Sequence, residues 1–91
     1  MPRLPSPIHF IIYSRAYCHL CDDMRDALHL LLQERPCEIE MIDVDADPLL
    51  LEKYDELVPL LMGKTRAGKL VRLCHYFLDA TAVSAFTEEE R

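Results

Sequence analysis

Two cysteines that lie three positions apart, Cys18 and Cys21, are the residues of this sequence best suited to chemistry. A pair at this spacing can act as a redox-active dithiol, contribute half of a metal site, or arise by chance from the composition. The spacing alone does not choose among these interpretations. The choice depends on the elements that hold the two side chains.

The segments on either side of the pair have different hydrophobic patterns. Residues 8–13 form an apolar run with β-branched and aromatic side chains, which is typical of a buried strand. From Cys18 to Leu32 the apolar residues recur at helical spacing, with acidic residues in the first turns, where the helix dipole favours them. Pro36 is expected to end this helix, because the residue before a proline disfavours helical angles. Residues 37–44 begin with a period of two and predict a second strand.

The rest of the chain predicts a second helix, a hairpin and a final helix. Asp47 is suited to cap a short helix, with Pro48 at its first position. Residues 58–62 predict a strand, and residues 69–73 predict the return strand of a hairpin with a polar loop between them. Asp79 is suited to cap the last helix.

The order strand, helix, strand, helix, strand, strand, helix predicts an α/β protein with a mixed four-stranded sheet. The first two strands and the helix between them form a βαβ unit, so these strands are expected to be parallel. The sequence contains no linker, repeat or low-complexity tract that would divide it. We therefore expect residues 1–91 to form one domain, with its core at about residues 8–86.

Composition and charge exclude several classes of function. A formal net charge of −6 argues against nucleic-acid binding, which needs clustered Lys and Arg. No apolar stretch approaches the ~20 residues of a membrane helix, and the N-terminal segment lacks the pattern of an export signal. We expect a cytoplasmic protein that binds neither nucleic acid nor membrane, with cysteines that serve as thiols, ligands or redox groups.

The junction of strand and helix gives the two cysteines different environments. Cys18 lies at the start of the helix and is expected to be exposed, whereas Cys21 shares the apolar side with Met24 and is expected to be buried. Free N–H groups at the helix start are expected to stabilise a thiolate at Cys18 and to lower its pKa below the ~8.5 of a free thiol, while the nearby Asp22 and Asp23 oppose this effect. The spacing also allows the two Cβ atoms to approach disulfide distance. This asymmetry favours a nucleophile with a resolving thiol behind it.

The stretch "SRAYCHLC" resembles the active-site loop of glutaredoxins, in which a basic residue precedes the dithiol by three positions. The segment "LVPLL" is similar to the Val-Pro or Thr-Pro that opens a strand in that family, and the element order is that of the thioredoxin superfamily. Together with "MIDVDADPLLLEKYDELVPLLMG", these stretches are especially similar to a group of short, poorly characterised glutaredoxin-like proteins. The resemblance covers about residues 8–86 and implies a three-layer thioredoxin-like fold of glutaredoxin type.

The resemblance also implies roles for particular residues. It matches Cys18 to the attacking cysteine and Cys21 to the resolving one. Arg15 matches the basic residue that attracts the carboxylate of glutathione, and Tyr17 would line the same groove. We assign none of these residues as a metal ligand in this interpretation.

A second group of roles falls at the start of the third predicted strand. Pro59 matches the cis-proline that lies against the dithiol in this family. The backbone of Val58 before it would hydrogen-bond an extended thiol substrate.

The sequence departs from glutaredoxins after the hairpin. Those proteins usually carry a Gly-Gly segment and an acidic residue that hold glutathione, whereas "RLCHYFLDAT" stands here. Bulky His75, Tyr76 and Phe77 are expected either to close part of the groove or to pack onto the sheet. These departures argue against the usual glutathione site of the family, so glutathione is one candidate co-substrate and not the expected one, and no other cofactor is expected.

The remaining cysteines favour structural interpretations. Cys37 lies in an alternating strand pattern and is expected to be a small buried residue. Cys74 is expected to be a buried thiol, with a secondary redox role as the alternative. With His75 it offers one potential ligand pair, but a structural zinc site needs four ligands in paired short spacings.

These features together predict a thiol–disulfide oxidoreductase of glutaredoxin-like type that serves cell redox homeostasis. Cys18 would attack and Cys21 would resolve, with a disulfide-containing protein or a small thiol as partner. Two alternatives remain open. One is a non-catalytic binding module that holds a peptide or protein beside Pro59, and the other is a metal or iron–sulfur binder that uses Cys18 and Cys21.

Overall fold

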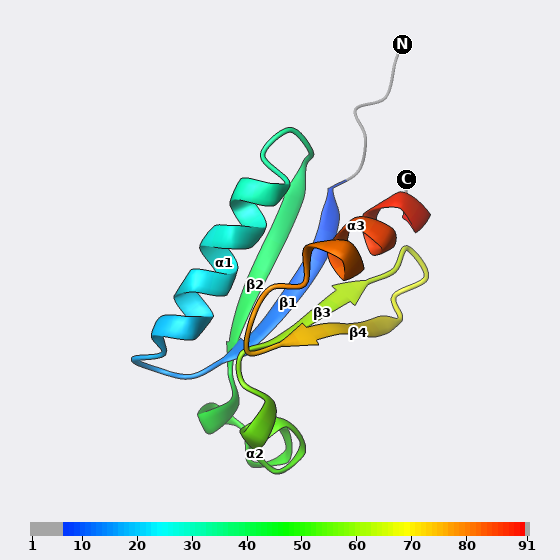
Figure 1. Ribbon diagram of the computed structural model, residues 1–91. Helices are drawn as coiled ribbons and strands as arrows, with labels where there is room; N and C mark the ends of the chain where they lie inside the picture. Colours follow the sequence, from blue (N-terminus) through cyan, green and yellow to red (C-terminus); the bar gives the residue numbers. More distant parts are fainter. Residues whose placement is uncertain (1–6, 91) are drawn as a thin grey trace.

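A computed structural model describes residues 7–90 of the chain (Figure 1). Its main elements follow in the order β1 (Ile8–Ser14), α1 (His19–Leu31), β2 (Cys37–Asp43), α2 (Pro48–Tyr54), β3 (Leu60–Lys64), β4 (Leu70–His75) and α3 (Ala80–Glu89). Two short 3-10 turns flank α2, η1 (Val44–Ala46) before it and η2 (Asp55–Leu57) after it. The predicted order of strands and helices is confirmed.

The four strands form one mixed sheet in the order β2-β1-β3-β4. β1 and β2 run parallel, in a register that extends from Ile8↔Cys37 to Ser14↔Asp43. β3 is antiparallel to both β1 and β4. The βαβ unit and the hairpin are therefore present as the sequence predicts.

The helices cover the two faces of the sheet unequally (Figure 1). α1 and α3 lie on one face, over the larger core, whose most buried members include Phe10, Ile12, Leu28, Leu61, Val83 and Phe86. α2 lies on the other face, over a smaller core formed by Tyr13, Val44, Tyr54, Leu60 and Met62. Because α2 is only one to two turns long, it covers the end of this face nearest the carboxyl end of β1 and leaves the other end open.

Side chains cap the starts of all three α-helices. The carboxylate of Asp47 accepts from Leu49 N–H at 2.9 Å, and that of Asp79 accepts from Ala82 N–H at 3.1 Å, as the sequence predicts. The cap of α1 is Cys18 itself. Among the helices of residues 7–90, none combines the length and apolar composition needed to cross a bilayer.

The first helix is shorter than predicted. α1 ends at Leu31, and Leu32 closes it by donating its N–H to the carbonyl of Leu28 at 3.0 Å. The chain then turns before Pro36, whose carbonyl accepts from Ile8 N–H at 3.1 Å. Residues 32–36 thus reverse the chain, and β2 follows beside β1.

The hairpin strands are displaced from their predicted positions. β3 occupies 60–64 instead of 58–62, and β4 occupies 70–75 instead of 69–73, with a β-bulge opposite Leu61 and Met62. Gly63 therefore belongs to the strand and not to the loop. Its place is explained by packing, because a Cβ there would lie 2.5 Å from the ring of Phe86. The other strands differ by one residue: β1 extends to Ser14 and β2 ends at Asp43.

Candidate active site

Cys18 and Cys21 form a disulfide at the start of α1, with their Cα atoms 5.2 Å apart. Cys21 is 1% exposed and faces the core beside Met24, as predicted. Cys18 is half-buried, so the expectation that it would be exposed is wrong. The difference arises because Cys18 adopts an extended backbone at the N-cap, which turns its sulfur back over the first turn.

The Cys18 sulfur is held by the helix that it caps. Its Sγ accepts from Cys21 N–H at 3.1 Å, and its carbonyl accepts from Asp22 N–H at 3.2 Å. The first N–H groups of a helix have no partner within the helix, and together they carry partial positive charge. The same bond would favour a thiolate at Cys18 after reduction.

Arg15 lies just before the dithiol in the sequence and forms ion pairs with acidic residues next to α2. Its guanidinium contacts Asp55 at 2.5 Å and Asp45 at 3.7 Å. The hydrogen bond to Asp55 raises the pKa of Arg15 above its ordinary value, with Asp45 adding to the effect. Its Nε atom is buried and has no partner among the described residues. Arg15 is therefore held by the acidic segment around α2.

Tyr17 projects away from the fold. Its backbone is left-handed, with φ 59°, and its side chain is fully exposed. The predicted role of lining a groove stays a prediction, since this position places the ring against no other side chain of the site. It does place a large apolar surface directly before Cys18.

Val58 and Pro59 lie at the same end of the sheet as the dithiol. The Val58–Pro59 peptide bond is cis, Pro59 is fully buried, and Val58 packs half-buried against the smaller core. Leu60, the next residue, pairs with Tyr13 near the carboxyl end of β1. The pairing of β1 with β3 thus brings the dithiol segment and the Val58–Pro59 segment to the same end of the sheet.

The segment after β4 contributes a feature that sequence reasoning did not foresee. Tyr76 has a left-handed backbone, with φ 66°, and its N–H donates to the Pro59 carbonyl at 2.8 Å. Its hydroxyl donates to the carbonyl of Glu56. Phe77, the next residue, is 71% exposed. The bulk of these side chains was visible in the sequence, but a tyrosine carries no sign of a left-handed backbone.

A shallow groove of about 200 Å³ runs between α1 and this segment. It starts at Leu20, which lies between the two cysteines, and its wall on the other side is Phe77. We call it the Leu20–Phe77 groove. The residues that line it are Leu20, Asp23, Met24, Ala27, Tyr76, Phe77 and Leu78.

The other two cysteines are separate thiols that pack against the larger core, but both are half-buried and so are less buried than expected. Burial raises the pKa of both Cys37 and Cys74, which makes them poorer nucleophiles at neutral pH. The Cys74 sulfur accepts from Asp79 N–H at 3.5 Å at the start of α3. Within residues 7–90 no group of three or more His, Cys, Asp or Glu side chains is placed to hold a metal ion.

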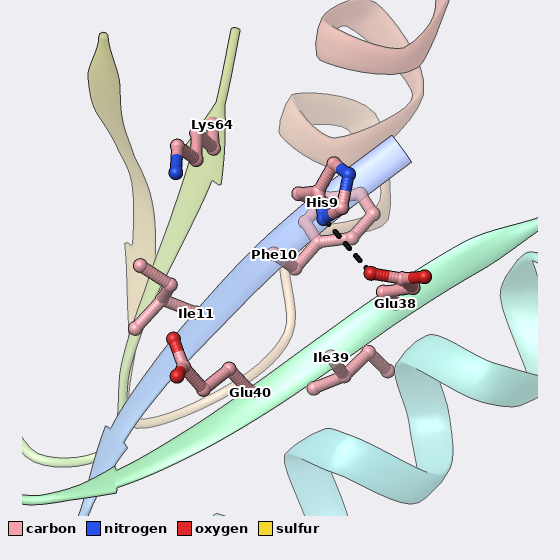
Figure 2. A pocket seen from close by; sticks show the side chains of 7 residues that line it. All are labelled: His9, Phe10, Ile11, Glu38, Ile39, Glu40 and Lys64. Atoms are coloured by element: carbon pink, nitrogen blue, oxygen red, sulfur yellow. Dashed lines mark ion pairs between the residues drawn. The ribbon is translucent and has the colours of Figure 1, made fainter. Parts of the chain in front are cut away.

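A second hollow lies at the open end of the sheet, away from the dithiol. Figure 2 shows it on β1 and β2, with an ion pair of 3.1 Å between His9 and Glu38, and with Glu40 and Lys64 nearby. The side chain of His9 is exposed on this strand. This hollow contains no cysteine and takes no part in the site described above.

Comparison with protein families shows to which family the chain belongs. The model of the glutaredoxin-like domain, DUF836, matches residues 9–88. The chain belongs to this glutaredoxin-like family. The resemblance seen in the sequence is therefore confirmed. No curated protein matches the sequence.

Solved structures place this glutaredoxin-like chain in the thioredoxin-like fold. Protein Ne2328 from Nitrosomonas europaea is 34% identical, with a TM-score of 0.78 over 94% of this chain and 98% of that one. The protein XcR50 from X. campestris is 22% identical, with a TM-score of 0.60 over 90% and 99%. Oxidized mitochondrial thioredoxin 3 from Saccharomyces cerevisiae is 19% identical, with a TM-score of 0.63 over 90% and 77%. The last two show the fold alone.

Proposed function

We propose that this glutaredoxin-like protein is a thiol–disulfide oxidoreductase that uses Cys18 and Cys21. The observation that carries the proposal is the asymmetry of the pair at the start of α1. Cys18 is half-buried and its sulfur accepts a helix N–H, whereas Cys21 is 1% exposed. A thiol in the first position can attack an incoming disulfide, and one in the second can react only with its neighbour.

In the proposed reaction the reduced protein begins with a thiolate at Cys18. This thiolate attacks one sulfur of a substrate disulfide, forms a mixed disulfide and releases the other substrate sulfur as a thiolate, which takes up a proton. Cys21 loses its proton and attacks the Cys18 sulfur, which releases the second substrate thiol and leaves the Cys18–Cys21 disulfide. Two electrons pass from the dithiol to the substrate, and a thiol reductant returns them by the reverse exchange.

The surrounding residues would orient this exchange. The backbone of Val58, before the buried Pro59, is proposed to hydrogen-bond the extended substrate, and Tyr17 to add contact area before Cys18. The proposal includes a reducing compartment such as the cytoplasm, because four cysteines with only one disulfide suit such a compartment.

Substitution of each cysteine tests the proposal directly. Cys18→Ser is expected to abolish reduction of a disulfide substrate, since the attacking sulfur is lost. Cys21→Ser is expected to retain the first attack and to accumulate a mixed disulfide, which mass spectrometry of the intact protein detects. Cys74→Ser is the matched control, because this thiol lies outside the pair. Equal turnover in Cys18→Ser and in the wild-type protein would exclude the proposed reaction.

A further inference from the structure

We propose that the dithiol acts on protein disulfides whose cysteine is flanked by an apolar and a basic residue, and that it discriminates against glutathione disulfide. This inference rests on the oxidoreductase function proposed above and assigns it a substrate class. Three observations support it independently. Arg15 is already ion-paired, the backbone N–H groups after β4 are already hydrogen-bonded, and the Leu20–Phe77 groove is apolar.

The first argument is that Arg15 is already neutralised. Its guanidinium contacts Asp55 and Asp45, and the carboxylate of Asp43 also acts on it. Glutathione carries two carboxylates and one ammonium group. One of its carboxylates would have to displace Asp55 from Arg15 and then lie among uncompensated negative charges. The electrostatic field around this arginine therefore disfavours an anionic ligand.

The second argument concerns the backbone after β4. A small anionic ligand can be held by free backbone N–H groups. Here the N–H of Tyr76 donates to Pro59, and that of Phe77 donates to the carbonyl of His75 at 2.8 Å. The Tyr76 hydroxyl ties the same segment to Glu56. Both N–H groups are therefore already hydrogen-bonded within the protein and are not free to bind an anionic ligand. The segment offers side chains to a substrate instead.

The third argument is the apolar surface that begins in the first turn of α1, the helix that Cys18 caps. Leu20 is 41% exposed and Phe77 is 71% exposed on opposite sides of the groove. Cys18 is the N-cap of α1 and Leu20 lies in the first turn of that helix, so a substrate segment bonded to Cys18 can extend along α1 into the groove. An apolar side chain next to the substrate cysteine can enter the groove and gain free energy from burial.

Charge adds a second element of recognition. Asp23 lines the groove, and no ion pair joins it to another described residue. The neighbouring Asp22 and Asp26 are compensated by Arg25, at 3.4 and 3.3 Å. A Lys or Arg of the substrate would pair with Asp23. The occupant is therefore an extended segment of another protein, since a second copy of this chain would bring a like net charge of −6.

The test compares three disulfides against the reduced protein by stopped flow. They are glutathione disulfide and the symmetric disulfides of two end-blocked peptides, Lys-Leu-Cys-Gly and Glu-Gly-Cys-Gly. Each rate is divided by the rate of dithiothreitol with the same disulfide, which removes differences in intrinsic reactivity. We expect this rate ratio to be at least about ten-fold higher for the Lys-Leu peptide than for glutathione disulfide, because the peptide gains one apolar contact and one charge pair.

Two variants locate the recognition. Phe77→Ser is expected to slow the Lys-Leu peptide by at least about five-fold and to leave glutathione disulfide within about two-fold. Asp23→Asn is expected to slow the same peptide by about two- to five-fold. Leu30→Ser, an equally large change at a side chain 70% exposed elsewhere on α1, is expected to leave all three rates unchanged. Melting curves establish that each variant is folded.

The outcomes separate this inference from the function on which it rests. If none of the three disulfides oxidises the dithiol, the oxidoreductase function itself is wrong. If glutathione disulfide reacts as well as the Lys-Leu peptide, or if Phe77→Ser reacts with that peptide like the wild-type protein, the oxidoreductase function stands and the inferred substrate class is overturned.

Discussion

At the dithiol, the position of the Cys18 sulfur at the start of α1 favours this cysteine as the attacking thiol in the proposed exchange. Cys18 caps the helix with its own side chain, so the N–H of Cys21 lies 3.1 Å from the atom that would carry negative charge. Cys21, one turn further along the helix, places its side chain in the core and donates its own N–H to the Cys18 sulfur. We expect the two thiols to differ in reactivity because of this difference in position along the helix.

Gly63 provides a prediction at the scale of one residue. Gly63→Ala is expected to lower the free energy of unfolding by about 1–3 kcal/mol, because the new Cβ would overlap the Phe86 ring at 2.5 Å. Urea denaturation measures the change. In a Phe86→Leu background the same substitution is expected to cost less, since the smaller side chain leaves room. An equal cost in both backgrounds would show that steric overlap is not the cause.

Among the elements, α2 shows how a short helix depends on its first residue. Seven residues form too few internal hydrogen bonds to sustain a helix alone, so the cap and the packing of Tyr54 on Tyr13 matter. The stacked rings lie 4.6 Å apart between centroids. Together they fix α2 over the end of the sheet at which Asp55 meets Arg15.

The cap of α2 can be tested by substitution. Asp47→Ala is expected to reduce the free energy of unfolding by about 0.5–2 kcal/mol, because the N–H of Leu49 loses its acceptor. Asp47→Asn keeps an oxygen at the same position and is expected to retain most of the stability. Chemical denaturation of both variants measures the effect. Similar losses in the two variants would indicate that charge, and not the hydrogen bond, stabilises α2.

For the whole molecule, the half-buried thiols make stability depend on pH. Burial raises the pKa of Cys74 and Cys37 in the folded state. For Cys74, the hydrogen bond from the Asp79 N–H lowers the pKa and the charge of the Asp79 carboxylate raises it, but burial is the largest effect. The unfolded chain therefore loses these protons first as pH rises. Because the unfolded state then binds fewer protons than the folded state, the free energy of unfolding falls with increasing pH.

The expected result is full stability below the ordinary thiol pKa of ~8.5 and a progressive loss above it. Denaturation of the oxidised protein at several pH values from neutral to alkaline measures this loss, with Cys18 and Cys21 held in their disulfide. The double variant Cys37→Ala and Cys74→Ala is expected to show a shallower decline over the same range. An identical decline in the variant would assign the effect to other groups.

The sequence alone determined the order of the elements and the place of the dithiol. Local patterns carry this information: the change from a strand run to helical spacing at Cys18, the cap at Asp47 followed by Pro48, and the cap at Asp79. The position of Cys18 and Cys21 at the helix start already favoured a redox pair, and the resemblance to glutaredoxins added roles for Arg15 and Pro59. Each of these signals lies within a few residues of the feature that it predicts.

The tertiary structure decided what surrounds the dithiol. Arg15 meets Asp55 only because α2 folds over the end of the sheet, and Tyr76 reaches Glu56 and Pro59 only because β4 lies beside β3. These contacts join residues that are distant in sequence, and their geometry depends on strand register and helix packing. Periodicity and caps contain no information about such contacts, because they describe only how a segment satisfies its own backbone and which of its sides is apolar.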